Sequence, residues 1–222
     1  MNRRRLIVAA NFICAAVLAV PCAAQATTAP NPSGGLVVGA ALVVAPNGAY
    51  AGKPSVLRGS VPTRGAVSVQ FKLADGTWQA IGEVTPNSIG AFELQWTPPA
   101  KGVYELRATP TGASVASANT AATTELGPLS VYSLQKTTWY GPGFYGERTA
   151  CGVKLTRRTL GVAHKTLPCG TLVEFYRAGE KVTVPVIDRG PYARGVSWDL
   201  TLPAARAIGM LGSERVGVLP IR

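Results

Sequence analysis

Residues 171–201 read TLVEFYRAGEKVTVPVIDRGPYARGVSWDLT, and they hold two strand-like runs rich in β-branched and aromatic residues, at 171–176 and 181–186. Further runs flank this stretch, at 137–140, 161–163 and 216–221. Six or so strands in fewer than 90 residues would leave exposed edges in an open sheet. The pattern therefore predicts a small closed barrel over 136–222.

One short helix is expected inside this region, at 202–208. Thr201 is placed to cap its N-terminus, Pro203 lies in the first turn and Gly209 follows the last turn. Asp199 stands just before the helix, and we expect it to hydrogen-bond the backbone at the helix start, with contact to a substrate as the alternative. Long surface helices are disfavoured, because the chain has 25 glycines, 17 prolines and only 15% charged residues.

A second series of short strands precedes the barrel, in segment 36–132. Its runs are 66–73, 77–84, 91–96 and 103–109, and Asp75-Gly76 supplies a hairpin turn. Such spacing predicts a β-sandwich. The "W-x-x-(I/L)-G" and "G-x-Y-x-L-R-A" strands resemble bacterial immunoglobulin-like (Ig-like) modules, for which a spacer or adhesive role is expected. The predicted fold class is all-β, an Ig-like β-sandwich followed by a six-stranded barrel with one short helix.

The N-terminus has the features of an export signal. Arg3 to Arg5 are followed by an apolar run of 15 residues and by Ala24-Gln25-Ala26, a small-x-small cleavage site. We therefore expect a signal peptide at 1–26, a linker at 27–35, and a secreted or cell-envelope protein without a stable membrane anchor after cleavage. A permanent anchor is the alternative, although the run is short for a membrane-spanning helix.

The charge of +11 is concentrated in the predicted barrel, where residues 136–222 carry 13 basic and six acidic side chains. A basic region attracts polyanions. Export argues against nucleic acid as this polyanion. Lys154, Arg157 and Arg158 form a basic run that either is a solvated surface or attracts polyanions.

The cysteines predict one disulfide. Cys14 and Cys22 leave with the signal peptide, and Cys151 and Cys169 remain in a chain bound for an oxidising compartment. Two buried free thiols are the alternative. A metal site is disfavoured because His164 is the only histidine, and we expect neither a metal nor a cofactor.

Short motifs in the barrel region carry the chemistry. In chain order they are Trp139-Tyr140-Gly141-Pro142-Gly143-Phe144-Tyr145-Gly146, Thr149-Ala150-Cys151-Gly152, Ala163-His164-Lys165-Thr166-Leu167-Pro168-Cys169-Gly170-Thr171, Val186-Ile187-Asp188-Arg189-Gly190-Pro191-Tyr192 and Trp198-Asp199-Leu200-Thr201. This ordered set resembles the rare lipoprotein A (RlpA) family of double-psi β-barrels over about 137–222. Barwin and expansin modules are more distant relatives of that barrel.

The resemblance implies a six-stranded barrel with a glycan groove across one face. It also implies lytic transglycosylase activity on peptidoglycan glycan strands, which are cut between N-acetylmuramic acid and N-acetylglucosamine to leave a 1,6-anhydro end. Most glycosidases need two carboxylates. In a lytic transglycosylase the sugar's own 6-hydroxyl is the nucleophile, so one group that donates and retakes a proton can suffice.

Asp188 is the candidate for that group. It follows the apolar run 182–187 at a strand end, where partial burial suits a carboxyl that must carry a proton. The alternative is a structural carboxylate that caps the following turn. His164 matches the groove histidine of the family, and the resemblance implies a catalytic role through a hydrogen bond to Asp188 or to substrate. A packed or surface histidine is the alternative.

Tyr140, Phe144 and Tyr145 lie in a glycine-rich segment and are expected to stack on sugar rings, although Tyr140 is equally suited to the barrel core. Arg189, next to Asp188, is expected to bind substrate as well.

One position departs from the family pattern. Val153 stands where members commonly carry Glu, and Glu147 is the nearest acid upstream. The paired cysteines also resemble those of barwin and expansin modules. The alternative to an enzyme is therefore a non-catalytic wall-glycan-binding module, and a purely structural or adhesive protein is a third hypothesis, which leaves His164 and Asp188 unexplained.

Overall fold

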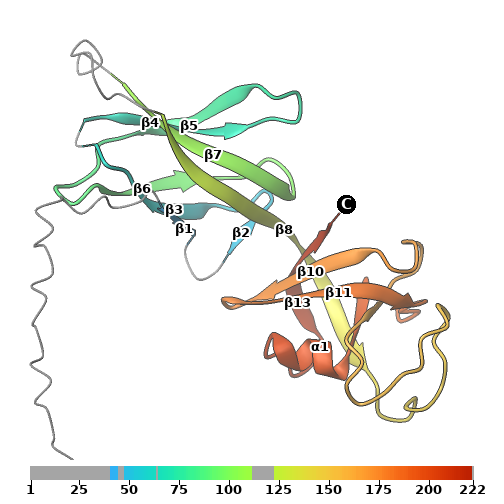
Figure 1. The fold of residues 1–222 in the computed structure, drawn as a ribbon. Helices are drawn as coiled ribbons and strands as arrows, with labels where there is room; N and C mark the ends of the chain where they lie inside the picture. The colour runs from blue at the N-terminus through green and yellow to red at the C-terminus, as the bar shows by residue number, and fades with distance from the viewer. Residues whose placement is uncertain (1–40, 45–47, 64, 112–122, 222) are drawn as a thin grey trace, which may run out of the picture. The chain divides into compact units, whose positions relative to one another are not determined.

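The computed structural model describes residues 41–44, 48–63, 65–111 and 123–221. The predicted signal peptide and linker lie outside these residues. The elements, in chain order, are β1 (Ala41–Val44), β2 (Ala49–Tyr50), β3 (Ser55–Ser60), β4 (Val67–Lys72), β5 (Trp78–Val84), β6 (Ala91–Trp96), β7 (Gly102–Pro110), β8 (Thr124–Tyr140), β9 (Val162–Ala163), β10 (Leu172–Arg177), β11 (Glu180–Asp188), β12 (Trp198–Thr201), α1 (Leu202–Ala207) and β13 (Glu214–Pro220) (Figure 1). In the described part of the chain, no helix has the length and apolar character needed to cross a membrane.

The first strands form two sheets that share one apolar core. One sheet has the order β1-β3-β6, and β5-β4-β7-β8 are neighbours in the other. Leu57 of β3, Phe71 of β4 and Leu106 of β7 are among the buried residues of this core. The predicted hairpin is present, because β4 pairs with β5 and Thr77 donates its backbone N–H to Asp75. The chain is mostly β as predicted, and the Ig-like character of this region stays a prediction.

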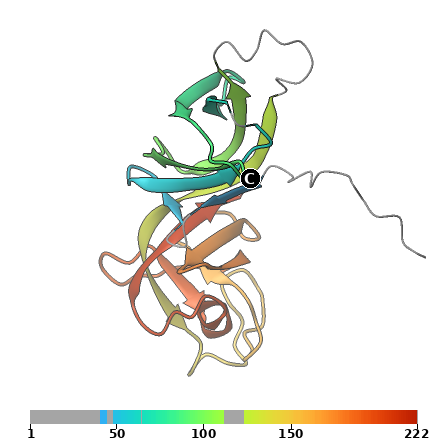
Figure 2. The same cartoon turned by 90° about the vertical axis from the view of Figure 1, so that its left-hand side faces the viewer.

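Strand β8 is long and takes part in both halves of the described chain. It pairs with β7 up to Val131, with β13 from Ser133 onward and with β12 over its last four residues. The strand therefore runs without interruption through 132–136, where the sequence suggested that one domain gives way to the next (Figures 1 and 2).

Six strands close into a barrel in the order β8-β13-β10-β11-β9-β12, and β12 returns to pair with β8. Two of the pairings are parallel, β9 with β11 and β8 with β12. The predicted six-stranded barrel is confirmed. The sequence pattern did not predict β12. Its four residues directly precede the helix and are too few to show an alternation of apolar and polar side chains.

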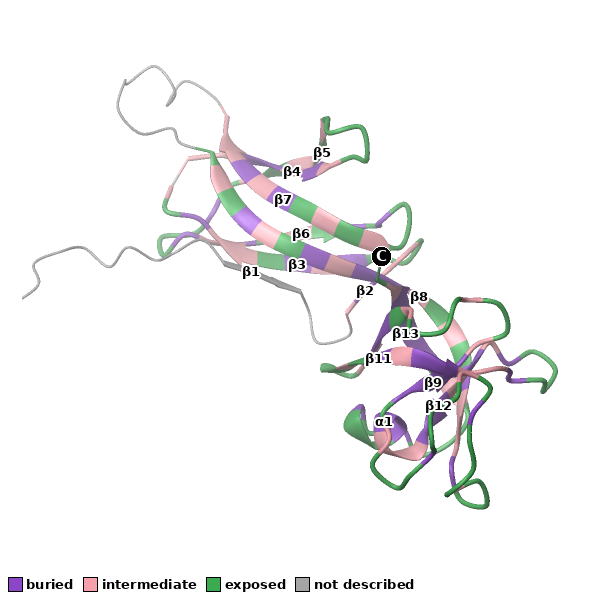
Figure 3. Cartoon of the chain, turned by 45° about the vertical axis from the view of Figure 1, so that its right-hand side comes forward, coloured by how far each residue is buried: buried purple, intermediate pink, exposed green. Residues whose placement is uncertain are grey.

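The barrel core is formed by side chains from all six strands and from α1. Its fully buried members include Phe175, Leu200 and Ile208. Buried residues gather in the barrel strands and the helix, and most loop residues are exposed (Figure 3). Packing is tight at the start of β9, where a Cβ on Gly161 would lie 2.3 Å from Ile187 Cδ1. A larger residue at this position would require the Ile187 side chain to shift.

The helix spans Leu202–Ala207, close to the prediction, with Pro203 in its first turn. Gly209, with φ +63°, follows its last turn in the left-handed region, where glycine carries no Cβ penalty. Thr201 occupies the N-cap position, but its side chain makes no capping bond. The hydroxyl instead accepts the N–H of Gly161 at 3.2 Å, which joins the helix start to β9.

Candidate active site

Four residues stand in a row across four neighbouring barrel strands. Asp188 at the end of β11 is opposite Ala163 of β9, Ala163 is opposite Asp199 of β12, and Asp199 is opposite Thr138 of β8. Residues opposed on adjacent strands direct their side chains to the same face. The two acids are separated by two strand spacings, or about 10 Å between Cα atoms. Strand register therefore places both carboxyl groups on one surface.

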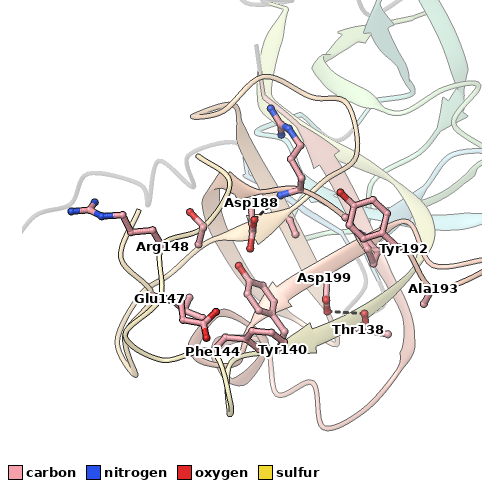
Figure 4. A pocket seen from close by; sticks show the side chains of 15 residues that line it. Thr138, Tyr140, Phe144, Glu147, Arg148, Asp188, Tyr192, Ala193 and Asp199 are labelled. Carbon is pink, nitrogen blue, oxygen red and sulfur yellow. Dashed lines mark hydrogen bonds between the residues drawn. The ribbon is translucent and has the colours of Figure 1, made fainter. Parts of the chain in front are cut away.

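All four residues line one pocket, with a volume of about 360 Å³ (Figure 4). The other lining residues are Tyr140, Phe144, Glu147, Arg148, Thr149, Leu155, Arg189, Gly190, Pro191, Tyr192 and Ala193. The floor is built from strand residues, and the loops after β8 and β11 supply the rim. Ala163, which stands between the two acids in the strand register, has only a methyl side chain.

The backbone orients the Asp188 carboxylate. Its Oδ1 accepts the N–H of Arg189 at 2.8 Å and the N–H of Ala150 at 2.9 Å. Both bonds use the same oxygen, so Oδ2 takes no part in either. Figure 4 shows Asp188 and the Tyr140 hydroxyl facing each other in the pocket.

Asp199 has a different environment. Its Oδ1 accepts a hydrogen bond from Thr138 Oγ1 at 2.7 Å. Burial raises the pKa of Asp199 and the negative charge of Asp188 adds to this, while the Thr138 bond acts in the opposite direction. The expected bond from Asp199 to the backbone at the helix start is wrong, because β12 directs the side chain into the pocket.

The Tyr140 hydroxyl is buried and makes no hydrogen bond of standard geometry to a described residue. Burial raises the pKa of Tyr140, and the charge of Asp188 and a hydrogen-bond interaction with its carboxylate raise it further. The hydroxyl is therefore placed to donate to Asp188 or to a bound ligand. The Tyr140 ring meets Phe144 edge-on with centroids 6.4 Å apart, and Phe144 is 53% exposed at the rim.

His164 lies outside the pocket lining. Its Nδ1 accepts the N–H groups of Leu167 at 3.0 Å and Thr166 at 3.2 Å, and its ring packs against Trp198 at 4.2 Å between centroids. Burial lowers its pKa, and the Arg189 charge lowers it further. Of the two roles expected for this side chain, the hydrogen bond to Asp188 is not formed, since Nδ1 accepts N–H groups of its own loop, and a hydrogen bond to substrate stays a prediction. The two residues are linked through the backbone instead, His164 N–H to Asp188 O at 3.1 Å.

The loop around His164 is held by a disulfide and by Arg189. Cys151 and Cys169 form the predicted bridge. The Arg189 guanidinium donates to the carbonyls of Leu167 at 2.9 Å and His164 at 3.3 Å, and lies 3.3 Å from Cys169 Sγ. Arg189 was predicted to bind substrate, but its guanidinium is engaged in holding this loop.

Tyr145 lies apart from the other predicted aromatic residues. It lines a second hollow, where the Arg157 guanidinium lies 5.7 Å from its ring centroid. Val153 is exposed and outside the pocket lining, whereas Glu147 lines the pocket.

Sequence reasoning gave no site role to several lining residues. Thr138 and Ala163 reach the pocket through strand register, which no local motif reveals. Tyr192 is 83% exposed at the rim, and its place in the Asp-Arg-Gly-Pro-Tyr segment was the signal available for it. Within the described ranges, no three His, Cys, Asp or Glu side chains are grouped as metal ligands.

Residues 133–222 match the double-psi β-barrel family model described as lytic transglycolase. The chain is 45% identical over 84 residues to "Probable endolytic peptidoglycan transglycosylase RlpA" of Aquifex aeolicus, covering 37% of this chain and 36% of that protein. It is 49% identical over 77 residues to the protein of that name from Synechocystis, covering 34% and 24%. Against "Endolytic peptidoglycan transglycosylase RlpA" of Campylobacter jejuni it is 41% identical over 86 residues, covering 38% and 30%.

The chain thus spans about a third or less of the length of these curated relatives. Among solved structures, the Streptomyces papain inhibitor aligns at 26% identity with a TM-score of 0.34, covering 40% of this chain and 93% of that one.

Proposed function

We propose that this chain, whose residues 133–222 form an RlpA-like double-psi β-barrel, cleaves peptidoglycan glycan strands as a lytic transglycosylase. The bond cut lies between N-acetylmuramic acid and N-acetylglucosamine, and the product ends in a 1,6-anhydro sugar. The protein acts in the cell envelope after export, and its partners are the glycan strands and, through the basic surface of the barrel, anionic wall polymers.

Asp188 serves as the general acid/base in this proposal. The observation that carries it is the carboxylate in the pocket, held through Oδ1 by the N–H groups of Ala150 and Arg189. Backbone donors fix the position of the group before substrate arrives, and such positioning lowers the barrier to proton transfer. Tyr140 and Phe144 contact the sugar rings.

His164 acts as a positioning residue. Its Nδ1 organises the loop that Arg189 also holds, and its backbone N–H reaches the Asp188 carbonyl. Loss of the imidazole ring should therefore loosen the loop around His164 and Arg189, the two groups that adjoin Asp188.

Incubation of the purified chain with peptidoglycan, followed by mass spectrometry for 1,6-anhydro products, tests the function directly. Asp188→Asn keeps the size of the side chain and an oxygen acceptor but cannot exchange the proton. We expect activity to fall about 10²–10⁴-fold while glycan binding persists. Asp75→Asn is the matched control, since Asp75 lies in an exposed hairpin turn between β4 and β5. Normal products from Asp188→Asn would refute the assigned role.

A non-catalytic wall-glycan-binding module is the second candidate. Val153 favours it, because an apolar, exposed residue stands where the family commonly has Glu. A protein that is pulled down with peptidoglycan but releases no anhydro products would be such a binder. Val153→Glu then gives a further comparison, since a gain of activity would mean that only this carboxylate was lacking.

A further inference from the structure

The pocket holds two strand-borne carboxyl groups, and the proposed function uses one. Asp188 and Asp199 each stand opposite Ala163, from the strands on its two sides. Both line the same pocket, and in the strand register the small Ala163 side chain stands between them. Paired carboxyl groups on either side of a scissile bond are the usual arrangement for glycosidic cleavage. A chain bound across this row would meet a carboxyl group on each side.

The hydrogen-bond partners of the two acids differ in kind. Asp188 Oδ1 accepts two backbone N–H groups, which can only donate and therefore suit a carboxylate. Asp199 is bonded to the Thr138 hydroxyl, which can donate or accept and so suits either protonation state. Burial raises the pKa of Asp199, in the direction that a proton-carrying acid requires.

Tyr140 lies beside both acids. Its hydroxyl is buried and faces Asp188, but no hydrogen bond of standard geometry joins it to a described residue. Burial raises the pKa of Tyr140, and the charge of Asp188, a hydrogen-bond interaction with Asp188 and the charge of Asp199 raise it further, so the hydroxyl remains a donor over the working pH range. The other charged groups that share the pocket with Asp199 are Glu147, Arg148 and Arg189.

Resting on the proposed function, we infer that two residues divide the acid and base roles given there to Asp188. Asp199 is a second catalytic residue, which donates the proton to the leaving glycosidic oxygen, and Asp188 acts as the base that accepts the proton of the sugar 6-hydroxyl. The bond from C1 to the bridging oxygen breaks, and its electron pair stays on that oxygen, which takes the proton of Asp199. The 6-oxygen forms the new bond to C1 and loses its proton to Asp188. One proton has then moved from Asp199 to Asp188, and exchange with solvent restores the starting state.

The test is the pH dependence of kcat/KM for release of 1,6-anhydro products by the full chain. Asp199→Asn keeps an oxygen acceptor for Thr138 but has no proton to donate, so we expect a loss of about 10²–10⁴-fold. Asp75→Asn, in the exposed hairpin turn, should keep the wild-type rate.

Variants of Thr138 give a pH profile that would not change if Asp199 had a purely structural role. Its hydrogen bond lowers the pKa of Asp199, so Thr138→Val should raise that pKa and shift the alkaline limb of the profile to higher pH. Thr138→Ser keeps the hydroxyl and should restore the wild-type limb.

The outcomes separate this inference from the proposed function. Wild-type protein that releases no anhydro products would overturn both. Active wild type with an equally active Asp199→Asn variant would overturn the role of Asp199 alone. If Asp199→Asn does not fold, as judged by circular dichroism, the Thr138 variants decide. An alkaline limb that stays in place in Thr138→Val would then overturn the inference.

Discussion

Removal of the Cys151–Cys169 bridge should destabilise the barrel by an amount that follows from loop length. The two cysteines are 18 residues apart in sequence. Closing a loop of that size removes chain entropy from the unfolded state worth about 3 kcal/mol at 25 °C. For a urea m-value of about 1–3 kcal/mol/M, the unfolding midpoint should fall by about 1–3 M. The double variant Cys151→Ala/Cys169→Ala avoids a new free thiol.

Hydrogen exchange as a function of urea locates the effect. Amides of Val184 and Val218 report on the barrel core, and those of Val69 and Leu106 report on the first sheets. The barrel amides should lose most protection, and reduction of the wild-type protein should reproduce the double variant. A loss below about 1 kcal/mol at the barrel amides would refute the loop-entropy reasoning.

The same bridge should also matter for activity. Ala150, whose N–H holds Asp188, is the neighbour of Cys151. The double variant should therefore lose activity at temperatures where its barrel is still folded. Full activity there would mean that the Ala150 bond survives without the bridge.

Three further results are expected. Tyr140→Phe removes a buried hydroxyl that faces Asp188 but makes no hydrogen bond of standard geometry to a described residue, so the free energy of unfolding should change little while kcat/KM falls; reduced stability with normal turnover would contradict a ligand-binding role. The lowered pKa of His164 means that the folded state binds fewer protons there, so barrel stability should decrease as the pH falls through about 6.5, the unfolded value, and His164→Gln should flatten this dependence in urea unfolding. Binding to peptidoglycan in a pull-down should weaken as salt rises, because long-range attraction by the basic barrel is screened; an unchanged bound fraction would exclude that attraction.

Several features of the barrel were accessible from the sequence alone. The strand runs, the helix at 202–208 and the disulfide each depend on local pattern or on an even count of cysteines. Asp188 could be named as a candidate because it ends a predicted strand in a contiguous motif that resembles the RlpA family. Local signals of this kind survive folding because short-range sterics and side-chain alternation set them.

Tertiary structure decided how the site residues are grouped. Register across four strands makes Thr138, Ala163 and Asp199 neighbours of Asp188. Three of these strands, β8, β9 and β11, lie far apart along the chain. The helix-cap interpretation of Asp199 failed for the same reason, since pairing with β8 directs its carboxyl to Thr138. The His164 side chain makes no bond to Asp188, because its Nδ1 accepts two N–H groups of its own loop and so has no proton to donate to that carboxylate. Pairings between strands depend on closure of the whole barrel, so no segment of sequence specifies them by itself.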